Sequence, residues 1–481
     1  MSIQGRTHPI EIFYVQEPVA DYVKATIDTV IKIHENEPFG DVLAFLTSQE
    51  EILNAFEILQ QYVQENNEKN SYRKKFPSGI IASNMSVLPL YGSLPHYRQV
   101  KVFQLSERGV RKVILATNVA ETSVTINGIV YVVDCGFHKL PHFDPAEGVE
   151  SVNVSIISKQ NAIQRAGRAG RTSAGKCYRL YTEEDYEKLP KSVPPEMCRS
   201  DLSYLLLQLK ALGIHNVLKF TFPTPPPAKS LLSSLETLYA LNAIDNEGNL
   251  TPTGNRMCEL PVKPMLAKML CNSGEFGCID EILSIVSMLQ VDDVFLKQSG
   301  KANIAARISR RNNFEVAEGD IIMYLNIMDS YLKIRSTGDE KKTKKACKDW
   351  CQKMYINYRV LEKAVEIRSS LEKLLKNKFQ IRNEKFDDID LGSAKTTRLQ
   401  KSIISGLFPQ AARLAPDSLY MGIRGAVLQL SPDSCLYHAV QPSWLVFASV
   451  QSSGDKTYMR DVMVANKDWL LEIAPHYYKE T

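Results

Sequence analysis

The first 190 residues alternate between short apolar segments and longer amphipathic ones, and this alternation limits the fold more than any other feature. The short segments are rich in branched and aromatic residues, which is typical of strands. They are Ile10–Val15, Asp41–Leu46, Val87–Tyr91, Lys112–Ala116, Ile129–Val133 and Cys177–Tyr181. Between several of them, apolar residues recur every three or four positions, as in Asp21–His34 and Gln49–Gln64, which predicts helices. We therefore expect an α/β domain over residues 1–190, with a largely parallel sheet and ligand sites at the carboxyl ends of its strands.

One stretch of this region departs from the alternation. In Phe137–Lys159, the apolar residues Val149, Val152, Val154 and Ile156 alternate with polar ones after an Asp-Pro turn. An alternation with period two predicts strands rather than a helix. We expect a β-hairpin over about 137–159 that protrudes from the sheet.

After Pro194–Pro195 the pattern changes to two helical segments and a short hairpin. The helical segments are Leu202–Leu212 and Leu231–Leu241, separated by the proline-rich Pro223–Pro227. Turn residues at the centre of Ala243–Thr251 predict a tight hairpin. This order suits a winged-helix domain over residues 191–260.

The rest of the chain divides into a helical region and a region of short strands. Residues from Pro261 to about Lys376 are almost wholly helical, which defines a domain over 261–378. Short strands return from about Leu391 and predict a small antiparallel barrel of the OB type over 391–481. These strands are Ala426–Gln429, Trp444–Ser449 and Tyr458–Val462. The polar stretch Gln380–Thr397 is the predicted linker between the two domains.

Composition excludes several classes of protein. The nine cysteines include no C-x-x-C pair, which argues against a zinc site and against a secreted disulfide framework. No apolar run approaches the roughly 18 residues of a membrane span, so no membrane partner is expected. The first twelve residues lack the apolar core of a signal peptide.

The charge of the chain is unevenly distributed. The net charge is +4, but residues Lys333–Lys378 contain 14 Lys or Arg against 6 Asp or Glu. Within them lies the run Lys341, Lys342, Lys344, Lys345 and Lys348. This run is either a solvated surface or an edge that faces a polyanion, and the sequence leaves both interpretations open.

The segment Gln164–Arg171 (QRAGRAGR) carries the strongest chemical signal. Arginines three residues apart on a helix are expected to project from one face, and each guanidinium suits phosphate oxygens. The intervening glycines would let the helix approach another surface closely. A purely structural helix held by ion pairs is the alternative, but this composition makes a poor core face, so we predict contact with phosphate.

Three further segments carry weaker signals. Small hydroxyl and amide side chains in Ala116–Ser123 directly follow a predicted strand, which suits sugar–phosphate contacts or an ordinary helix cap. Tyr91–Pro95 is a turn whose backbone could approach a nucleic-acid strand. Phe103, at the end of the next helix, is by default a core residue.

Taken in order, these segments resemble the DEAH-box/RHA group of superfamily 2 RNA helicases. The resemblance begins at Gly5–Ile10 and covers nearly the whole chain. The segments that resemble helicase motifs IV, IVa, V and VI are Asp41–Ile52, Tyr91–Pro95, Ala116–Asn127 and Gln164–Arg171. Those that resemble the winged helix, the helical ratchet domain and the OB-fold are Pro195–Ile214, Glu318–Asp320 with Trp350–Cys351, and Pro442–Val446 with Tyr458–Arg460 and Trp469–Tyr478. The resemblance implies a second RecA-like lobe followed by these three domains, and an ATP-dependent RNA helicase.

The resemblance also assigns residues to ATP. Gln164, Arg168 and Arg171 would reach the γ-phosphate, with both arginines stabilising charge in the transition state. Phe103 would stack on the adenine, and Thr122 and Asn127 would lie on the ribose side. Many family members have Asp at the position of Asn127. The Mg²⁺ ligands are expected in a first lobe, so no metal site is predicted here.

For RNA, the resemblance implies contacts to the backbone of a single strand from Gly92, Ser93, Thr117 and Asn118. The Phe137–Lys159 hairpin would separate or guide strands. Leu430–Ser434 stands where many members read His-Pro-Ser-Ser, a departure within the OB-fold. Other expectations follow from the family: a G-patch activator, a spliceosomal (mRNA splicing) or ribosome-assembly particle, and a nuclear location, with the cytoplasm as the alternative.

The 481 residues contain neither Asp-Glu-x-His nor a P-loop of the form G-x-x-x-x-G-K-[ST]. Gly170–Cys177 comes near, but it ends in Cys and lies between a predicted helix and a predicted strand, the reverse of the required order. We therefore expect no ATP turnover from this chain without a first lobe. The chain is either part of a complete helicase, which we favour, or a natural short form that binds RNA or partners without turnover. A winged-helix/OB scaffold that binds only protein is a third interpretation.

Overall fold

The computed structural model describes residues 8–478 except 71–83, 93, 95, 108, 123–125, 292, 297–299, 337–339, 385–392 and 454–455. These residues form two compact units. Unit 1 comprises the described residues of Met1–Leu140 and Asn153–Pro194, and unit 2 those of Pro141–Val152 and Pro195–Thr481. No helix in the described part of the chain is long and apolar enough to cross a membrane.

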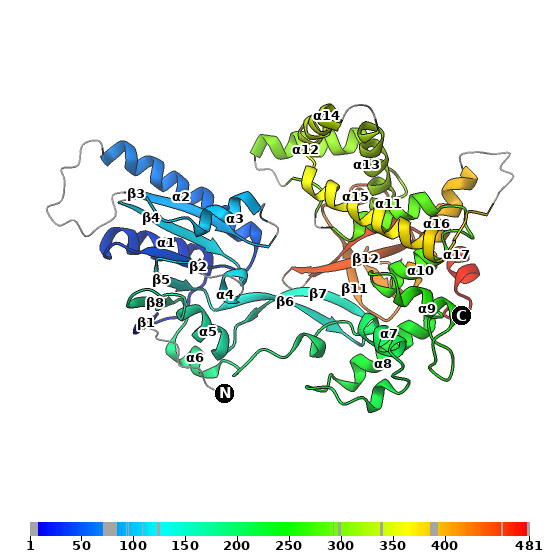
Figure 1. Cartoon of the computed structure of the whole chain (residues 1–481), viewed down its shortest axis with the longest axis horizontal. Helices are drawn as coiled ribbons and strands as arrows, with labels where there is room; N and C mark the ends of the chain where they lie inside the picture. The colour runs from blue at the N-terminus through cyan, green and yellow to red at the C-terminus, as the bar shows by residue number, and fades with distance from the viewer. Residues whose placement is uncertain are drawn as a thin grey trace. The chain divides into compact units, whose positions relative to one another are not determined.

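Unit 1 contains a six-stranded parallel sheet in the order β1-β8-β5-β2-β4-β3 (Figure 1). Its strands are β1 (Ile10–Tyr14), β2 (Asp41–Phe45), β3 (Asn84–Leu90), β4 (Val110–Ala116), β5 (Ile129–Asp134) and β8 (Gly175–Arg179). Its helices are α1 (Tyr22–Asn36), α2 (Gln49–Asn70), α3 (His96–Phe103), α4 (Val119–Thr122), α5 (Lys159–Ala166) and α6 (Glu183–Lys188). The predicted parallel α/β sheet is confirmed.

The strands read as continuous apolar runs because both faces of the sheet are covered. Val42 and Ala44 of β2 pack in the cluster that contains residues of α1 and α2. Leu43 and Phe45 pack in the cluster that contains residues of α3, α4 and α5. Alternate residues of one strand thus serve opposite cores, which fixes the register of β2.

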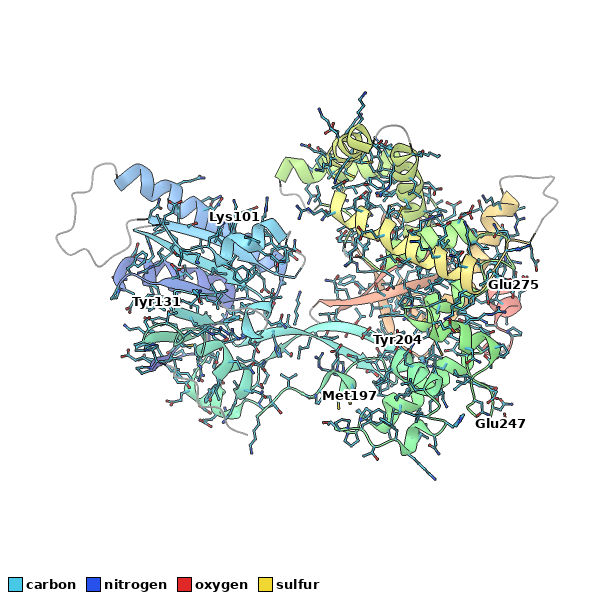
Figure 2. All side chains as sticks on the ribbon, viewed as in Figure 1. Lys101, Tyr131, Met197, Tyr204, Glu247 and Glu275 are labelled. Carbon is cyan, nitrogen blue, oxygen red and sulfur yellow. The ribbon has the colours of Figure 1, made fainter. Side chains whose placement is uncertain are left out.

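A cationic side chain is also buried in this sheet. Arg111 of β4 is fully buried, and its guanidinium lies 5.3 Å from the ring centroid of Tyr131, which is labelled in Figure 2. It donates hydrogen bonds to the carbonyl oxygens of Ile33, Glu37 and Pro38. Arg111 therefore ties the end of α1 to the sheet through carbonyl groups, and it forms no ion pair with a carboxylate of the described residues.

The predicted hairpin forms, but its end does not stand free. Strands β6 (Phe137–Asp144) and β7 (Val149–Ile156) make a two-stranded sheet, of which residues 141–152 belong to unit 2. There Val149 is buried among residues of the C-terminal barrel, and Glu150 pairs with Lys263 at 2.7 Å. The hairpin therefore extends from the sheet as expected, and Val149 near its turn packs in an apolar core of unit 2.

The rest of unit 2 is a helical region followed by a barrel (Figure 1). Its helices are α7 (Ser203–Ala211), α8 (Ala228–Ala240), α9 (Pro252–Cys258), α10 (Pro264–Asn272), α11 (Ile279–Leu289), α12 (Gly300–Asn313), α13 (Asp320–Arg335), α14 (Glu340–Lys353), α15 (Tyr358–Lys373), α16 (Ser393–Leu407) and α17 (Lys467–Ile473). The closed barrel has the order β10-β11-β13-β12-β9. Its strands are β9 (Ala411–Leu414), β10 (Tyr420–Gly422), β11 (Val427–Leu430), β12 (Trp444–Ser453) and β13 (Lys456–Val464).

Helix α13 is fastened to the barrel at its first residues. The carboxylate of Asp320 accepts hydrogen bonds from the backbone N–H groups of Cys435, at 2.8 Å, and Val462, at 3.3 Å. Gly319 has φ +117°, and a Cβ there would lie 2.5 Å from the carbonyl oxygen of Val462, so only glycine fits. Helical region and barrel are thereby joined within unit 2.

One sequence expectation fails at the start of the barrel region. The predicted linker Gln380–Thr397 enters helix α16 at Ser393, and the strands begin at Ala411 rather than near Leu391. Ile403, Ile404 and Leu407 of α16 are buried with residues of α10. The first residues of the helix are polar and its apolar stripe begins only at Leu399, so the sequence pattern did not predict a helix there.

Candidate functional site

Helix α5 contains the first three residues of the QRAGRAGR segment, and residues next to it in the sequence determine where it begins and ends. Ser158 caps it by accepting a hydrogen bond from the backbone N–H of Asn161, whose side-chain oxygen accepts one from the N–H of Ser158, both at 3.2 Å. The helix ends at Ala166, with Gly167 as its C-cap. A Cβ at Gly170 would lie 2.8 Å from the carbonyl oxygen of His8, so this glycine permits the close approach that the sequence predicted.

The three arginines of the segment do not share one face, contrary to the expectation. Only Arg165 is helical, because α5 ends before Arg168 and Arg171. Arg165 is fully buried, Arg168 is 9% exposed and Arg171 is exposed. The guanidinium of Arg168 donates a hydrogen bond to the backbone carbonyl of Glu121. Burial, together with the charge of Arg171, lowers the pKa of Arg168. Gln164 is partly buried.

Arg165 is held by two carboxylates. Its guanidinium lies 3.0 Å from Glu121 and 2.7 Å from Asp134, and both carboxylates are buried. It also lies over the ring of Phe45, 4.8 Å from the centroid, and donates to the carbonyl of Phe137. Burial alone would lower the pKa of Arg165, but the charges of Asp134 and Glu121 outweigh it and raise the pKa. Here the structural ion-pair interpretation applies.

Glu121 connects this cluster to the Ala116–Asn127 segment. It lies on α4, whose first turn is closed by hydrogen bonds from Ala120 N–H to Thr117 O and from Glu121 N–H to Asn118 O, at 3.1 and 3.0 Å. The side chain of Asn161 also donates to Glu121. One short helix therefore lies between the polar residues after β4 and the arginines of the QRAGRAGR segment.

Three of the residues assigned to RNA lie at the carboxyl edge of the sheet. Gly92 follows β3, Thr117 and Asn118 follow β4, and the N–H of Thr117 bonds the carbonyl of Leu90 at 3.1 Å. Asn118 and Gly92 are exposed. A Cβ at Gly92 would meet no atom within 4 Å, so packing does not require glycine there. Ser93 lies outside the described residues.

Two residues assigned to ATP lie at the opposite, amino edge. Phe103 ends α3 and is 41% exposed, so its default interpretation as a core residue is wrong. Asn127 is exposed and precedes β5. Asp41, at the start of β2, contacts the segments that follow these two residues. Its carboxylate accepts a hydrogen bond from Ser106 Oγ at 2.7 Å, and its backbone N–H donates one to the carbonyl oxygen of Gly128 at 3.2 Å. The side chain of Thr122 lies outside the described set.

Sequence reasoning missed Glu121, Asp134 and Asp41. Asp134 had a signal, because a carboxylate at the carboxyl end of a buried parallel strand lies at the edge where ligand sites form. Glu121 and Asp41 had none beyond their places in motifs. The rejected P-loop candidate Gly170–Cys177 leads into β8 rather than a helix, and Cys177 is buried with its pKa raised to about 12 by desolvation.

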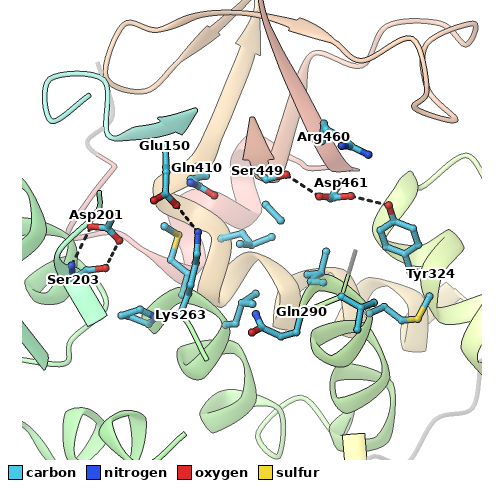
Figure 3. Close-up of a pocket in the computed structure, with 18 of the residues that line it drawn as sticks. Glu150, Asp201, Ser203, Lys263, Gln290, Tyr324, Gln410, Ser449, Arg460 and Asp461 are labelled. Carbon is cyan, nitrogen blue, oxygen red and sulfur yellow. Dashed lines mark hydrogen bonds and ion pairs between the residues drawn. The ribbon is translucent and has the colours of Figure 1, made fainter. Parts of the chain in front are cut away.

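Unit 2 contains a cavity of about 380 Å³ (Figure 3). Asp461 accepts from Tyr324 Oη at 2.7 Å and from Ser449 Oγ at 2.9 Å on its wall. The charged residues that line it are Glu150, Asp201, Lys263, Asp293, Arg460 and Asp461. Carboxylates outnumber cationic groups, so the cavity does not favour phosphate. In the described part of the chain, no three His, Cys, Asp or Glu side chains gather as a metal site would require.

Comparison with known proteins assigns each region. Residues 25–173 match the helicase conserved C-terminal domain, and 234–262 match the winged-helix part of the helicase associated domain. Residues 263–324 match its ratchet-like part, and 399–477 match an oligonucleotide/oligosaccharide-binding fold. A human protein named "Probable ATP-dependent RNA helicase DHX35" is 45% identical over 100% of this chain. A Caenorhabditis elegans protein named as its homolog is 39% identical, also over 100% of this chain.

The chain matches the C-terminal region of DEAH-box/RHA helicases.

The expected second RecA-like lobe, winged helix, ratchet domain and OB-fold are therefore confirmed as the fold of this chain. The chain corresponds to the C-terminal region of its relatives and spans 64% of the human protein and 61% of the nematode protein.

Proposed function

We propose that this chain supplies the second lobe and the accessory domains of an ATP-dependent RNA helicase that translocates on RNA and remodels RNA or RNA–protein complexes. The observation that carries the proposal is the contact between α4 and α5. Arg165 and Arg168 both bond Glu121, three residues after Asn118 and next to Thr122. Residues assigned to RNA and to ATP thus meet through one short helix, which suits an enzyme that couples the two ligands.

In this proposal, Gln164, Arg168 and Arg171 face the γ-phosphate. The exposure of Arg171 and the position of Arg168 beyond the end of α5 suit cations that meet a ligand from outside the chain. The exposed ring of Phe103 offers a platform for the adenine. Thr122 and Asn127 lie on the ribose side. ATP hydrolysis supplies the free energy of the cycle.

The phosphate cradle and the Mg²⁺ ligands must come from a first lobe, because these 481 residues contain neither motif. Without that lobe, the chain should show no RNA-stimulated ATPase activity. With it, the lobes would close on a single strand and reopen, which advances the RNA in the 3′-to-5′ direction that the family implies.

RNA would meet Gly92, Ser93, Thr117 and Asn118 through its backbone. The open space beside Gly92 supports this assignment, since a close backbone approach to a ligand is a reason for glycine that packing does not supply. The hairpin would guide the strand. A G-patch activator, a spliceosomal or ribosome-assembly particle and a nuclear location remain part of the proposal.

The test is the substitution Arg168→Ala in the full-length protein. Loss of an arginine that stabilises transition-state charge should lower RNA-stimulated ATPase turnover by about 10³-fold, while RNA affinity stays within a few-fold. Arg413→Ala, on the exposed side of β9, removes the same charge and should change neither. Comparable losses of turnover and of RNA affinity would contradict the assigned role.

The natural short form is the alternative, and the mass of the endogenous protein separates the two. A first lobe of about 200 residues would add on the order of 20 kDa to the 54.2 kDa of this sequence. A mass near that of the sequence would favour a protein that binds RNA or partners without turnover.

A further inference from the structure

Helix α14 carries two faces of opposite character. One face is buried: Cys347 and Cys351 are at most 2% exposed, and the ring of Trp350 lies 6.0 Å from those of Phe314 and Tyr331. The other face carries exposed lysines, namely Lys342, Lys344, Lys345, Lys348 and Lys353. Figure 2 shows long side chains projecting outward from this helix. The packed face holds the lysines on a fixed support.

The charges of this face are uncompensated. Among the residues that the structure describes, none of these five lysines forms an ion pair, and only Asp349 is an exposed acid between them. Lys348 instead lies over the ring of Tyr358, 5.6 Å from the centroid. Other lysines of unit 2 are paired, as Lys376 is with Glu372 and Lys401 with Glu472.

The lysines also lie where they weaken the helix. α14 begins at Glu340, so Lys342, Lys344 and Lys345 occupy its first two turns. Positive charge there opposes the helix dipole, and like charges four residues apart, such as Lys344 and Lys348, repel. Local stability does not account for this arrangement, whereas a polyanion would relieve both effects.

We propose that the lysine face of α14 binds the phosphate backbone of RNA without sequence preference. The face extends over the 12 residues from Lys342 to Lys353, about 18 Å of helix, which is long enough for several successive phosphates. The cavity of unit 2, with its excess of carboxylates, offers no such surface. This inference rests on the proposed function, because it adds a contact for the RNA that the helicase handles.

The test compares two triple variants of the 481-residue chain. Lys344→Gln, Lys345→Gln and Lys348→Gln together remove three charges from the face. The control combines Lys376→Gln, Lys395→Gln and Lys401→Gln, which remove the same charge from paired lysines. The probe is a fluorescent oligouridine of about 30 nucleotides, and its affinity is measured by anisotropy between about 50 and 200 mM salt.

Each lost phosphate contact should lower the slope of log affinity against log salt by about 0.7. The face variant should therefore lose about 2 from the slope and roughly tenfold in affinity at low salt, while the control keeps the slope of the unmodified chain. Tryptophan fluorescence, to which Trp350 of the same helix contributes together with Trp444 and Trp469, reports that unit 2 remains folded.

Three outcomes would overturn the proposal. If the unmodified chain binds RNA and the face variant keeps its slope, this surface is not an RNA contact, but the proposed function survives. If the unmodified chain binds no RNA, both fail. If the face variant loses affinity only for polyglutamate, run in parallel, the partner is an acidic protein.

Discussion

Helices α5 and α14 are both rich in cationic side chains, but they hold them in opposite ways. Arg165 of α5 is fully buried between Glu121 and Asp134. The five described lysines of the α14 face are exposed and form no ion pair with any residue that the structure describes. A buried guanidinium needs carboxylates in fixed positions, so it determines geometry. An exposed ammonium that lacks a partner adds little to stability and remains available to a ligand. The comparison separates cations that build the site from cations that meet a ligand.

The largest expected effect comes from Arg165→Met. The substitution leaves Glu121 and Asp134 buried without their cation, and breaking a buried pair in this way costs about 3–5 kcal/mol. Unit 1 should unfold at a lower urea concentration, as followed by hydrogen exchange of its peptides. All three tryptophans, Trp350, Trp444 and Trp469, belong to unit 2, so tryptophan fluorescence provides an internal control.

Arg165→Lys sharpens this prediction. Lysine keeps the charge but cannot reproduce the planar fork that bonds Glu121, Asp134 and the carbonyl of Phe137 together. It should recover only part of the lost stability. If Arg165→Met left unit 1 as stable as before, the cluster would not be the structural centre of the site.

The reach of sequence reasoning differs between the same two helices. The start of α5 depends on Ser158 and Asn161, which are close in sequence. The strands can likewise be predicted from their own apolar residues. The partners of Arg165 come from β5 and α4, 31 and 44 residues away, so no local pattern reveals them. The failed prediction of one arginine face has a local cause, since α5 ends at Ala166, two residues before Arg168.

For α14, the sequence revealed the charge but not its arrangement. From the sequence, the lysine run could be either a solvated surface or an edge that faces a polyanion. Our proposal of a polyanion edge depends on the positions of Cys347 and Cys351 on the buried face of the helix. The assignments of Gly92, Thr117, Asn118, Phe103 and Asn127 came from resemblance and remain predictions. The structure adds that the residues assigned to RNA lie at the carboxyl edge of the sheet, whereas Phe103 and Asn127 lie at its amino edge. This separation depends on the arrangement of the strands, which the spacing of residues in the sequence does not give.

The next prediction concerns His34, which burial beside Arg111 keeps neutral in the folded chain. Desolvation, and then the charge of Arg111, lower the pKa of His34 to about 4, against an ordinary value of 6.5. Protonation therefore favours the unfolded chain, so this contribution to stability is complete above about pH 6.5 and is lost as the pH falls toward 4. The loss should reach at most about 3 kcal/mol.

His34→Gln tests it by removing the titrating group. Unit 1 of the variant should lose less stability than the unmodified chain between pH 6.5 and 4, measured as the difference in urea midpoint at each pH. Equal losses in both proteins would show that His34 is protonated as readily in the folded chain as in the unfolded one.

The smallest expected effect is an increase in stability rather than a loss. Lys344→Glu places a negative charge near the start of α14 and four residues before Lys348, which favours the helix dipole and creates an attractive pair. Unit 2 should gain about 0.5 kcal/mol, measured by urea unfolding with tryptophan fluorescence, while RNA affinity falls. Lys376→Glu, which breaks the pair with Glu372, should lose stability instead and leave RNA affinity unchanged. A residue whose replacement stabilises the fold but weakens binding is retained for the ligand. If Lys344→Glu destabilised unit 2, the lysine face would belong with Arg165 among the cations that build the structure.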